Sequence, residues 1–165
     1  MSNKVIIDLT QCLCNEGKKI EFCGNFLPED SLLSYPQSKF VSVDYVLNVV
    51  FTNPNVEADG NLIVEVSGLC DKCAKQITKK FDFPFEICFC KDQTSDPDMF
   101  VYSGSKLDVT EAFNQEIVLN LPTSFLCKED CKGLCPKCGA DRNVCDCGCD
   151  TTKENPFSFL KNLKF

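Results

Sequence analysis

Histidine and tryptophan are absent from the 165-residue sequence, and methionine occurs only twice. Without histidine, one chain cannot build a Ser-His-Asp triad, a Cys-His thiol protease pair or an H-E-x-x-H zinc protease site. Cations are also in the minority, since 17 Lys and Arg stand against 24 Asp and Glu for a formal net charge of −7. A negative chain disfavours sequence-independent binding to nucleic acid. These absences exclude most common enzyme chemistries, and we expect a protein that is not an enzyme.

Long apolar runs are missing as well. Residues 1–8 contain no apolar stretch of the about 7–15 residues that a signal peptide needs. No segment approaches the roughly 18 uncharged apolar residues of a membrane span. The longest apolar-rich run, residues 41–51, is interrupted by Ser42, Asp44 and Asn48. The sequence therefore predicts a cytoplasmic protein that has no membrane partner.

Cysteine is the residue in excess, with 14 in the chain. In a secreted protein an even number of this size would suit a set of disulfides. In the reducing cytosol thiols stay free, and clustered cysteines more often hold a metal ion. Because the predicted compartment is the cytoplasm, we favour metal binding over a disulfide scaffold.

Three segments alternate apolar and polar residues with the period of a half-buried strand. They span residues 41–51, 56–69 and 77–87. Parallel strands need crossovers of about a dozen residues or more, so the short polar breaks here predict an antiparallel meander. Two shorter strand-like runs, 5–9 and 19–26, precede the meander, and a polar turn near residues 15–17 separates them from each other. Gly60 inside the second segment predicts a bulge or a tight turn.

Two helices are expected after the strands. Asp108 is a plausible N-cap of a helix over about 108–120, with Glu111 three residues later as in a capping box. Its apolar face would consist of Val109, Phe113 and Ile117. Asn155 and Pro156 suit the start of a short second helix whose apolar edge would dock on the sheet or bind a partner, and we favour docking.

The resulting fold class is α+β and β-rich, an antiparallel meander with one or two packed helices and a small Cys-rich tail. We divide the chain into a β-rich body over residues 1–126, a Cys-rich segment over 127–150 and a C-terminal helix over 151–165.

Seven cysteines lie in the Cys-rich segment, and their spacing points to a metal. Cys135-Pro136-Lys137-Cys138-Gly139 has the form of a metal knuckle, because two thiolates two residues apart can chelate one ion. We predict a structural Zn²⁺ held by Cys135, Cys138, Cys145 and Cys147. Cys127 or Cys131 are the alternatives for the second pair. Seven cysteines exceed one site, so three are spare or a second site exists.

An iron–sulfur cluster would also use four cysteines, but neither common ferredoxin spacing is present. Zinc is therefore the preferred metal. The remaining cysteines, Cys12, Cys14, Cys23, Cys88 and Cys90, show no ligand spacing and are expected to be buried free thiols.

A second C-x2-C motif, Cys70 and Cys73, lies between two predicted strands. A thioredoxin-like redox pair would need a helix directly after the motif, and strand periodicity resumes too soon to leave room for one. The pair could instead bind metal with a cysteine from elsewhere or close a hairpin. Residues 70–80 also carry four lysines. We treat this hairpin as a candidate contact with RNA or a protein partner, alternatively as a solvated basic face, through Cys70, Lys72, Cys73, Lys75, Lys79 and Lys80.

Several of these segments resemble one family, the YceD-like large ribosomal RNA subunit accumulation proteins. Gly68-Leu69-Cys70-Asp71-Lys72-Cys73, followed by a Phe-rich strand, is similar to the family's core motif. Residues 119–122 and 126–139 resemble the Cys-bearing C-terminal signature of its Gram-positive branch, and residues 155–163 resemble its closing helix. Lys72 stands where the family prefers Arg, and lysine lacks the planar guanidinium that binds phosphate or carboxylate with two parallel hydrogen bonds.

The resemblance implies a non-enzymatic cytoplasmic protein linked to accumulation of 23S ribosomal RNA. Its partner would be large-subunit pre-ribosomal RNA or a ribosomal protein, and no small-molecule substrate is expected. The excess of cysteine alone supports an alternative, a thiol-based redox or metal-binding protein. The acidity of the chain suits a cationic protein partner better than RNA.

Overall fold

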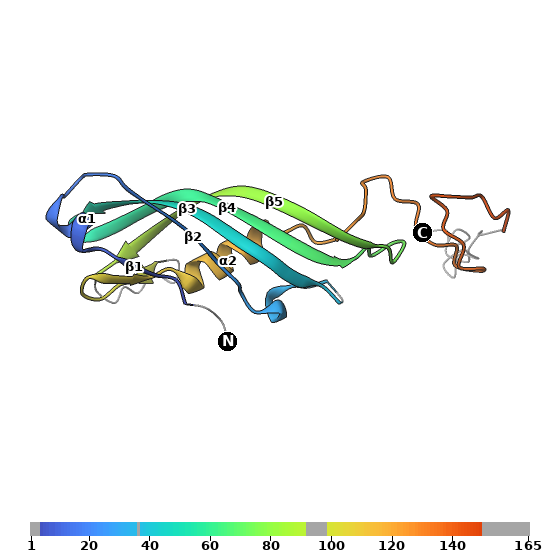
Figure 1. Cartoon of the computed structure of the whole chain (residues 1–165), viewed down its shortest axis with the longest axis horizontal. Coiled ribbons are helices and arrows are strands. Elements are labelled where there is room, and N and C mark those ends of the chain that lie inside the picture. The colour runs from blue at the N-terminus through green and yellow to red at the C-terminus, as the bar shows by residue number, and fades with distance from the viewer. Residues whose placement is uncertain (1–3, 36, 92–98, 150–165) are drawn as a thin grey trace, which may run out of the picture.

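A computed structural model describes residues 4–35, 37–91 and 99–149. A five-stranded sheet of order β2-β3-β4-β5-β6 dominates the molecule (Figure 1). Its strands are β2 Ile20–Phe26, β3 Lys39–Thr52, β4 Asn55–Leu69, β5 Gln76–Cys90 and β6 Phe100–Val101. The predicted antiparallel meander is confirmed for β2 to β5, and only the two-residue β6 pairs in parallel. The β-rich fold class is thereby confirmed.

The inner face of the sheet is the hydrophobic core. Along β4, Leu62, Val64 and Val66 are fully buried, and alternate residues of β5 from Phe83 to Phe89 join them. Cross-strand partners on this face, such as Val43 opposite Val64, bring β-branched side chains together. The Phe-rich pattern of β5 therefore serves packing.

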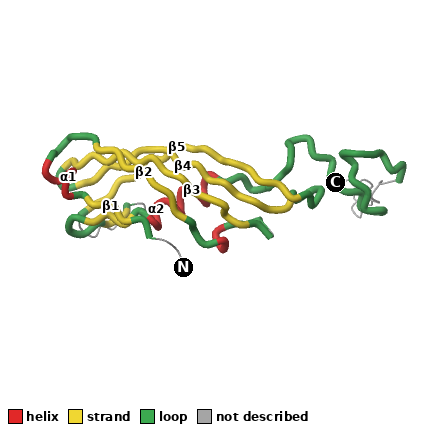
Figure 2. Tube along the Cα trace, in the orientation of Figure 1, coloured by secondary structure: helices red, strands yellow, loops and turns green. Residues whose placement is uncertain are grey.

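Helix α2, Thr110–Asn120, covers this inner face (Figures 1 and 2). The predicted face is confirmed, since Val109, Phe113 and Ile117 are completely buried. The Phe113 ring lies 5.2 Å from the ring of Phe85, edge-on, and 5.3 Å from that of Tyr45. Ring pairs of this geometry add to the free energy gained from burial alone. The second predicted helix, at the C-terminus, lies outside the described residues.

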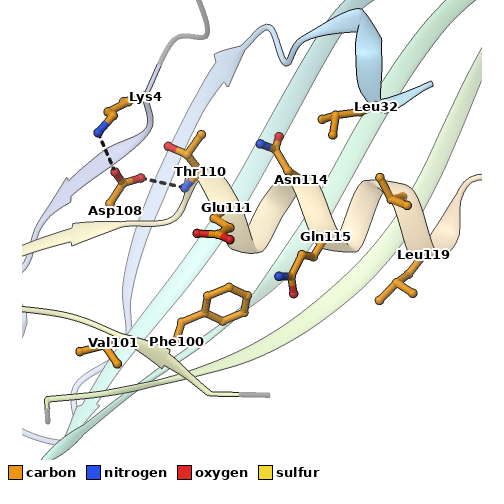
Figure 3. A pocket seen from close by; sticks show the side chains of 11 residues that line it. Lys4, Leu32, Phe100, Val101, Asp108, Thr110, Glu111, Asn114, Gln115 and Leu119 are labelled. Atoms are coloured by element: carbon orange, nitrogen blue, oxygen red, sulfur yellow. Dashed lines mark hydrogen bonds and ion pairs between the residues drawn. The ribbon is translucent and has the colours of Figure 1, made fainter. Parts of the chain in front are cut away.

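The start of α2 differs slightly from the predicted capping box. The helix begins at Thr110, and Val109 occupies the N-cap position. Asp108 lies one residue earlier, where its Oδ1 accepts the Thr110 N–H at 3.0 Å and its Oδ2 pairs with Lys4 at 3.7 Å (Figure 3). Asp108 therefore supports the helix start through a local turn.

The N-terminal region forms a second layer beside α2. Strand β1, Ile6–Asp8, pairs with β7, Lys106–Asp108, in a two-stranded antiparallel sheet. A short helix α1, Thr10–Cys14, follows where the sequence indicated only a strand end and a turn. Five residues are too few to show a helical period, which explains why α1 was not predicted. A 3₁₀ turn, η1 Asp30–Leu32, interrupts the loop before β3.

No described helix is long and apolar enough to cross a bilayer.

A groove of about 990 Å³ runs beside α2, with Phe100 and Val101 of β6 on its opposite wall (Figure 3).

Gly60 occupies a regular position in β4, so the predicted bulge there is wrong. The ladder is continuous through Leu47, Gly60 and Phe85, and the register shifts instead between Phe40 and Ser42. A Cβ atom at Gly60 would lie 1.9 Å from the Val46 carbonyl oxygen. Glycine is therefore required by close approach of the neighbouring backbone.

Gly60→Ala should lower the free energy of unfolding by about 3 kcal/mol, because the added methyl meets backbone that cannot swing aside. Gly24→Ala is the matched control in β2. Its Cβ would meet the end of the Tyr45 side chain, the hydroxyl oxygen at 2.6 Å and Cζ at 2.8 Å, rather than backbone. Urea titration should show the smaller loss for Gly24→Ala, and equal losses would contradict this account.

Candidate metal centres

The first group of cysteines lies at the end of the β4–β5 hairpin. Cys70 and Cys73 come from the hairpin turn, and Cys127 and Cys131 come from the segment after α2. The Sγ atoms of Cys70 and Cys131 are 3.8 Å apart, and those of Cys73 and Cys127 are 3.6 Å apart. Disulfide sulfurs lie about 2.05 Å apart, so these are free thiols. Four sulfurs around one ion at about 2.3 Å would be about 3.8 Å apart, which matches this group.

A pair of hydrogen bonds brings the two segments together. The Asp71 N–H donates to the Phe125 carbonyl at 2.9 Å, and the Phe125 N–H donates to Asp71 Oδ2 at 2.6 Å. The Phe125 side chain is fully buried and stacks on Tyr35 at a centroid distance of 5.2 Å. The core therefore holds Phe125, and Phe125 places Cys127 beside Cys70.

The second group contains Cys135, Cys138, Cys147 and Cys149, and its sulfurs also lie within 4.8 Å of one another. It packs on the first hairpin through the backbone. The Leu134 N–H donates to the carbonyl of Lys72 in the β4–β5 turn at 3.0 Å. Within the Cys-rich segment itself, the Arg142 N–H donates to the Gly133 carbonyl at 3.0 Å. The two groups thus form neighbouring parts of one Cys-rich end of the molecule.

Both C-x2-C motifs fold into the same turn. The Cys70 N–H donates to the Lys75 carbonyl, and the Ala74 N–H donates back to the Cys70 carbonyl. Cys135, Gly139 and Ala140 repeat the two hydrogen bonds. The fifth residue has positive φ in each turn, 54° at Ala74 and 74° at Gly139. A turn of this shape directs N–H groups at the first sulfur.

Backbone N–H groups lower the pKa of the first cysteine in each turn, and for Cys70 they include one from outside the turn. Burial alone would raise the pKa of Cys70, but N–H groups that include those of Cys127 and Cys73 bring it to about 6. The N–H groups of Cys138 and Lys137 outweigh burial and lower the pKa of Cys135 to about 6. The thiolate is the form that binds metal, so both turns favour ligation.

Neighbouring sulfurs have the opposite effect on the last ligands. The Cys131 sulfur, followed by burial, raises the pKa of Cys127 to about 12. The sulfurs of Cys138 and Cys147 likewise raise the pKa of Cys149 to about 12. Four thiols this close share protons, and a bound cation would stabilise all four as thiolates.

Asn143 connects the two groups. Its Nδ2 donates to Cys131 Sγ at 3.5 Å, and its Oδ1 accepts the Lys132 N–H at 2.9 Å. Asp141 Oδ1 accepts from both the backbone N–H and Nδ2 of Asn143, which orients the amide. Outer-shell donors of this kind position a ligand sulfur and help to balance its charge.

Three of the four cysteines predicted as ligands, Cys135, Cys138 and Cys147, come together. Cys145 does not join them, because its N–H donates to the Asp141 carbonyl in a tight turn and its exposed Sγ lies 3.8 Å from that same oxygen. Cys149 takes the fourth place. The alternative ligands Cys127 and Cys131 belong to the first group, with Cys70 and Cys73, 54 to 61 positions away.

The hairpin lysines have mixed surroundings. Lys72 and Lys75 are exposed in the turn, and Lys80 pairs with Glu65 at 3.5 Å. Of the other cysteines, only Cys12 is buried as expected. Cys14 and Cys23 are exposed, and Cys88 and Cys90 are half-buried. No cysteine lines the groove beside α2.

Gly133→Ala and Gly139→Ala should separate backbone strain from docking of the second group. Both residues have positive φ, which costs about 1 kcal/mol for alanine. A Cβ at Gly139 meets nothing within 4 Å, whereas one at Gly133 would lie 2.8 Å from the Lys72 carbonyl oxygen. Gly133→Ala should therefore lower the free energy of unfolding by about 3 kcal/mol and Gly139→Ala by about 1 kcal/mol. Equal losses in urea titrations would show that the contact with Lys72 is unimportant.

The sequence matches the family described as large ribosomal RNA subunit accumulation protein YceD over residues 58–164, well over half of the chain. It is 28% identical over 120 residues to uncharacterized proteins of Mycobacterium tuberculosis (strain H37Rv) and Mycobacterium bovis, covering 66% of this chain and 54% of theirs. It is 21% identical over 164 residues to large ribosomal RNA subunit accumulation protein YCED homolog 1, chloroplastic, of Arabidopsis thaliana, covering 79% of this chain and 50% of that protein. The chain thus spans about half the length of the curated relatives it matches. No solved structure matches it. Both thiol groups lie within the matched residues, and the chain belongs to the YceD family.

Proposed function

We propose that this protein is a non-enzymatic accessory factor in accumulation of 23S ribosomal RNA and assembly of the large ribosomal subunit, acting in the cytoplasm as a binding protein. The observation that carries the proposal is the family match over residues 58–164. The printed name of the plant relative points to the same process. The ribosomal connection comes from these relatives, and the structure supplies the surfaces that such a protein could use.

The two cysteine groups suit a structural Zn²⁺ each. All donors are thiolates, the sulfur spacing fits a tetrahedron, and a chain without histidine can supply no imidazole. Bound zinc would cross-link the β4–β5 hairpin to residues 127–149. That segment needs such a cross-link, because its larger aliphatic side chains, Leu134 and Val144, are 41% and 83% exposed and form no core.

The alternative role in thiol redox chemistry lacks its usual structural context. Cys70 and Cys73 follow a strand, as in redox motifs, but they open a hairpin turn that leads directly into β5. A helix N-terminus is therefore not the source of the low pKa of Cys70. The thiolate is also the form that binds metal, so the low pKa suits ligation without a redox role.

Metal content should distinguish the two ligand assignments. We expect two metal ions in the wild-type chain, and loss of one ion in Cys149→Ser, because serine replaces a sulfur of the second group. Cys145→Ser is the matched control from the same segment and should keep both ions. Elemental analysis with a count of reactive thiols measures each. Full metal content in Cys149→Ser together with loss in Cys145→Ser would restore the assignment based on spacing.

The cellular role is tested on sucrose gradients. Full-length protein carrying a small epitope tag should migrate with precursors of the large subunit at low salt, and its depletion should lower 23S relative to 16S ribosomal RNA. In depleted cells, the Cys73→Ser variant should migrate less with these precursors and should not restore 23S ribosomal RNA, because the Cys-rich end is not folded. Cys145→Ser should do both as the wild type does. Absence of the wild-type protein from all precursor fractions would contradict the proposed function.

A further inference from the structure

The outer face of the β2–β5 sheet, opposite α2, is acidic. Its side chains form rows that run across the strands, and the first and third of three neighbouring rows carry five carboxylates. One row contains Glu21, Asn48, Asp59 and Glu86; the next contains Cys23, Val46, Asn61 and Pro84; the third contains Asn25, Asp44, Ile63 and Asp82. Beyond the first row lie Val50, Glu57 and Cys88. We call these fifteen positions the outer face. Six are carboxylates, and none is Lys or Arg. The next row toward the hairpin turn, with Ser42, Glu65 and Lys80, is not included, because Lys80 neutralises Glu65 there at 3.5 Å.

Little of this charge is neutralised within the described part of the chain. Lys19 reaches in from the segment before β2 and pairs with Asp59 at 2.9 Å. Asp82 accepts a hydrogen bond from the neutral Asn61 amide. Glu21, Asp44 and Glu86 are exposed and form no ion pair among the residues that the structure describes. The outer face therefore presents a negative field to solvent.

Two exposed aliphatic residues form a small apolar strip among these carboxylates. Val46 lies in the second row and Ile63 diagonally beside it in the third, and they are 41% and 37% exposed. Rows two residues apart along a strand are separated by about 7 Å, so the two acidic rows lie about 14 Å apart. A polypeptide about 10 Å wide could contact the strip and extend cationic side chains to both rows.

From this arrangement we infer that the outer face binds a lysine- and arginine-rich segment of a protein. Aliphatic stems of the basic side chains would cover Val46 and Ile63, and the charged ends would meet the two acidic rows. RNA fits this face poorly, because its phosphates carry the same sign of charge. Two zinc ions held by eight thiolates would add a charge of about −2 each and make the protein still more acidic. The inference rests on the proposed function and names the class of its partner, a strongly basic protein.

Binding can be measured with a fluorescein-labelled peptide of repeated Lys-Ala-Arg-Leu units and the full-length protein. We expect saturable binding that weakens as salt is raised. The triple variant Glu21→Gln, Asp44→Asn, Glu86→Gln removes three carboxylates that form no ion pair, and it should weaken binding about tenfold. A labelled transcript of a 23S ribosomal RNA segment serves as the competing class of ligand.

The matched control is Glu16→Gln, Glu29→Gln, Glu129→Gln. These three exposed carboxylates lie away from the sheet face, so the control changes the net charge by the same amount. It should leave peptide affinity within about twofold of wild type, because nearby charges dominate steering and binding. Equal weakening by both triple variants would overturn the inference, as would tighter binding of the RNA transcript than of the peptide.

The inference and the proposed function can fail separately. If the wild type binds the peptide through this face but never migrates with large-subunit precursors, the proposed function is wrong and the docking face stands. If the triple variant of the outer face binds the peptide as the wild type does, the docking face is wrong, whatever the gradients show.

Discussion

The contact between the β4–β5 turn and the chain after α2 determines where both cysteine groups lie. Asp71 and Phe125, 54 positions apart, exchange two hydrogen bonds at this point. Phe125 can take part because its ring is buried against Tyr35, and the position of that ring follows from the hydrophobic core. The packing of the sheet and helix thus fixes the position of Phe125, and Phe125 in turn fixes the position of the first thiol group. The second group depends on the first through the Leu134 bond to Lys72.

The two ends of the molecule are stabilised by different means. The sheet and α2 bury a continuous set of aromatic and aliphatic side chains, which is the usual source of folding free energy. Residues 127–149 have no such core; their turns are held by backbone hydrogen bonds, and their cysteines belong to two groups that could hold a metal ion. Small segments of this kind generally need a metal or a covalent cross-link to remain folded. Each C-x2-C turn could contribute to such a cross-link, since one short motif offers two candidate sulfur ligands and N–H donors to the first of them.

The two faces of the sheet have divided roles for the same geometric reason. Side chains of a strand alternate between faces, so one sequence can place phenylalanine and valine inward and carboxylates outward. The inner face is covered by α2, while the outer rows stay exposed in the part of the chain that the structure describes. Negative charge is consequently concentrated over β2 to β5 and separated from the lysines of the hairpin turn. This separation allows one small protein to offer two chemically different surfaces.

The sequence by itself determined the strands, the buried face of α2 and the chemistry of any metal site. Period-2 alternation is a local property, and a chain with 14 cysteines and no histidine can offer only sulfur as its soft ligand. The sequence did not predict the short helix α1, because five residues are too few to show a helical period. It also did not predict the role of Gly60, because that role depends on the backbone of a neighbouring strand. Tertiary structure alone decided which cysteines meet. Spacing favoured Cys145, but its N–H closes a turn on Asp141 and carries its sulfur away from Cys135, so Cys149 lies there instead. Cys70 and Cys73 find Cys127 and Cys131 only because the folded core brings the hairpin turn to the end of the α2 segment. Such long-range proximity is a property of packing that local spacing does not encode.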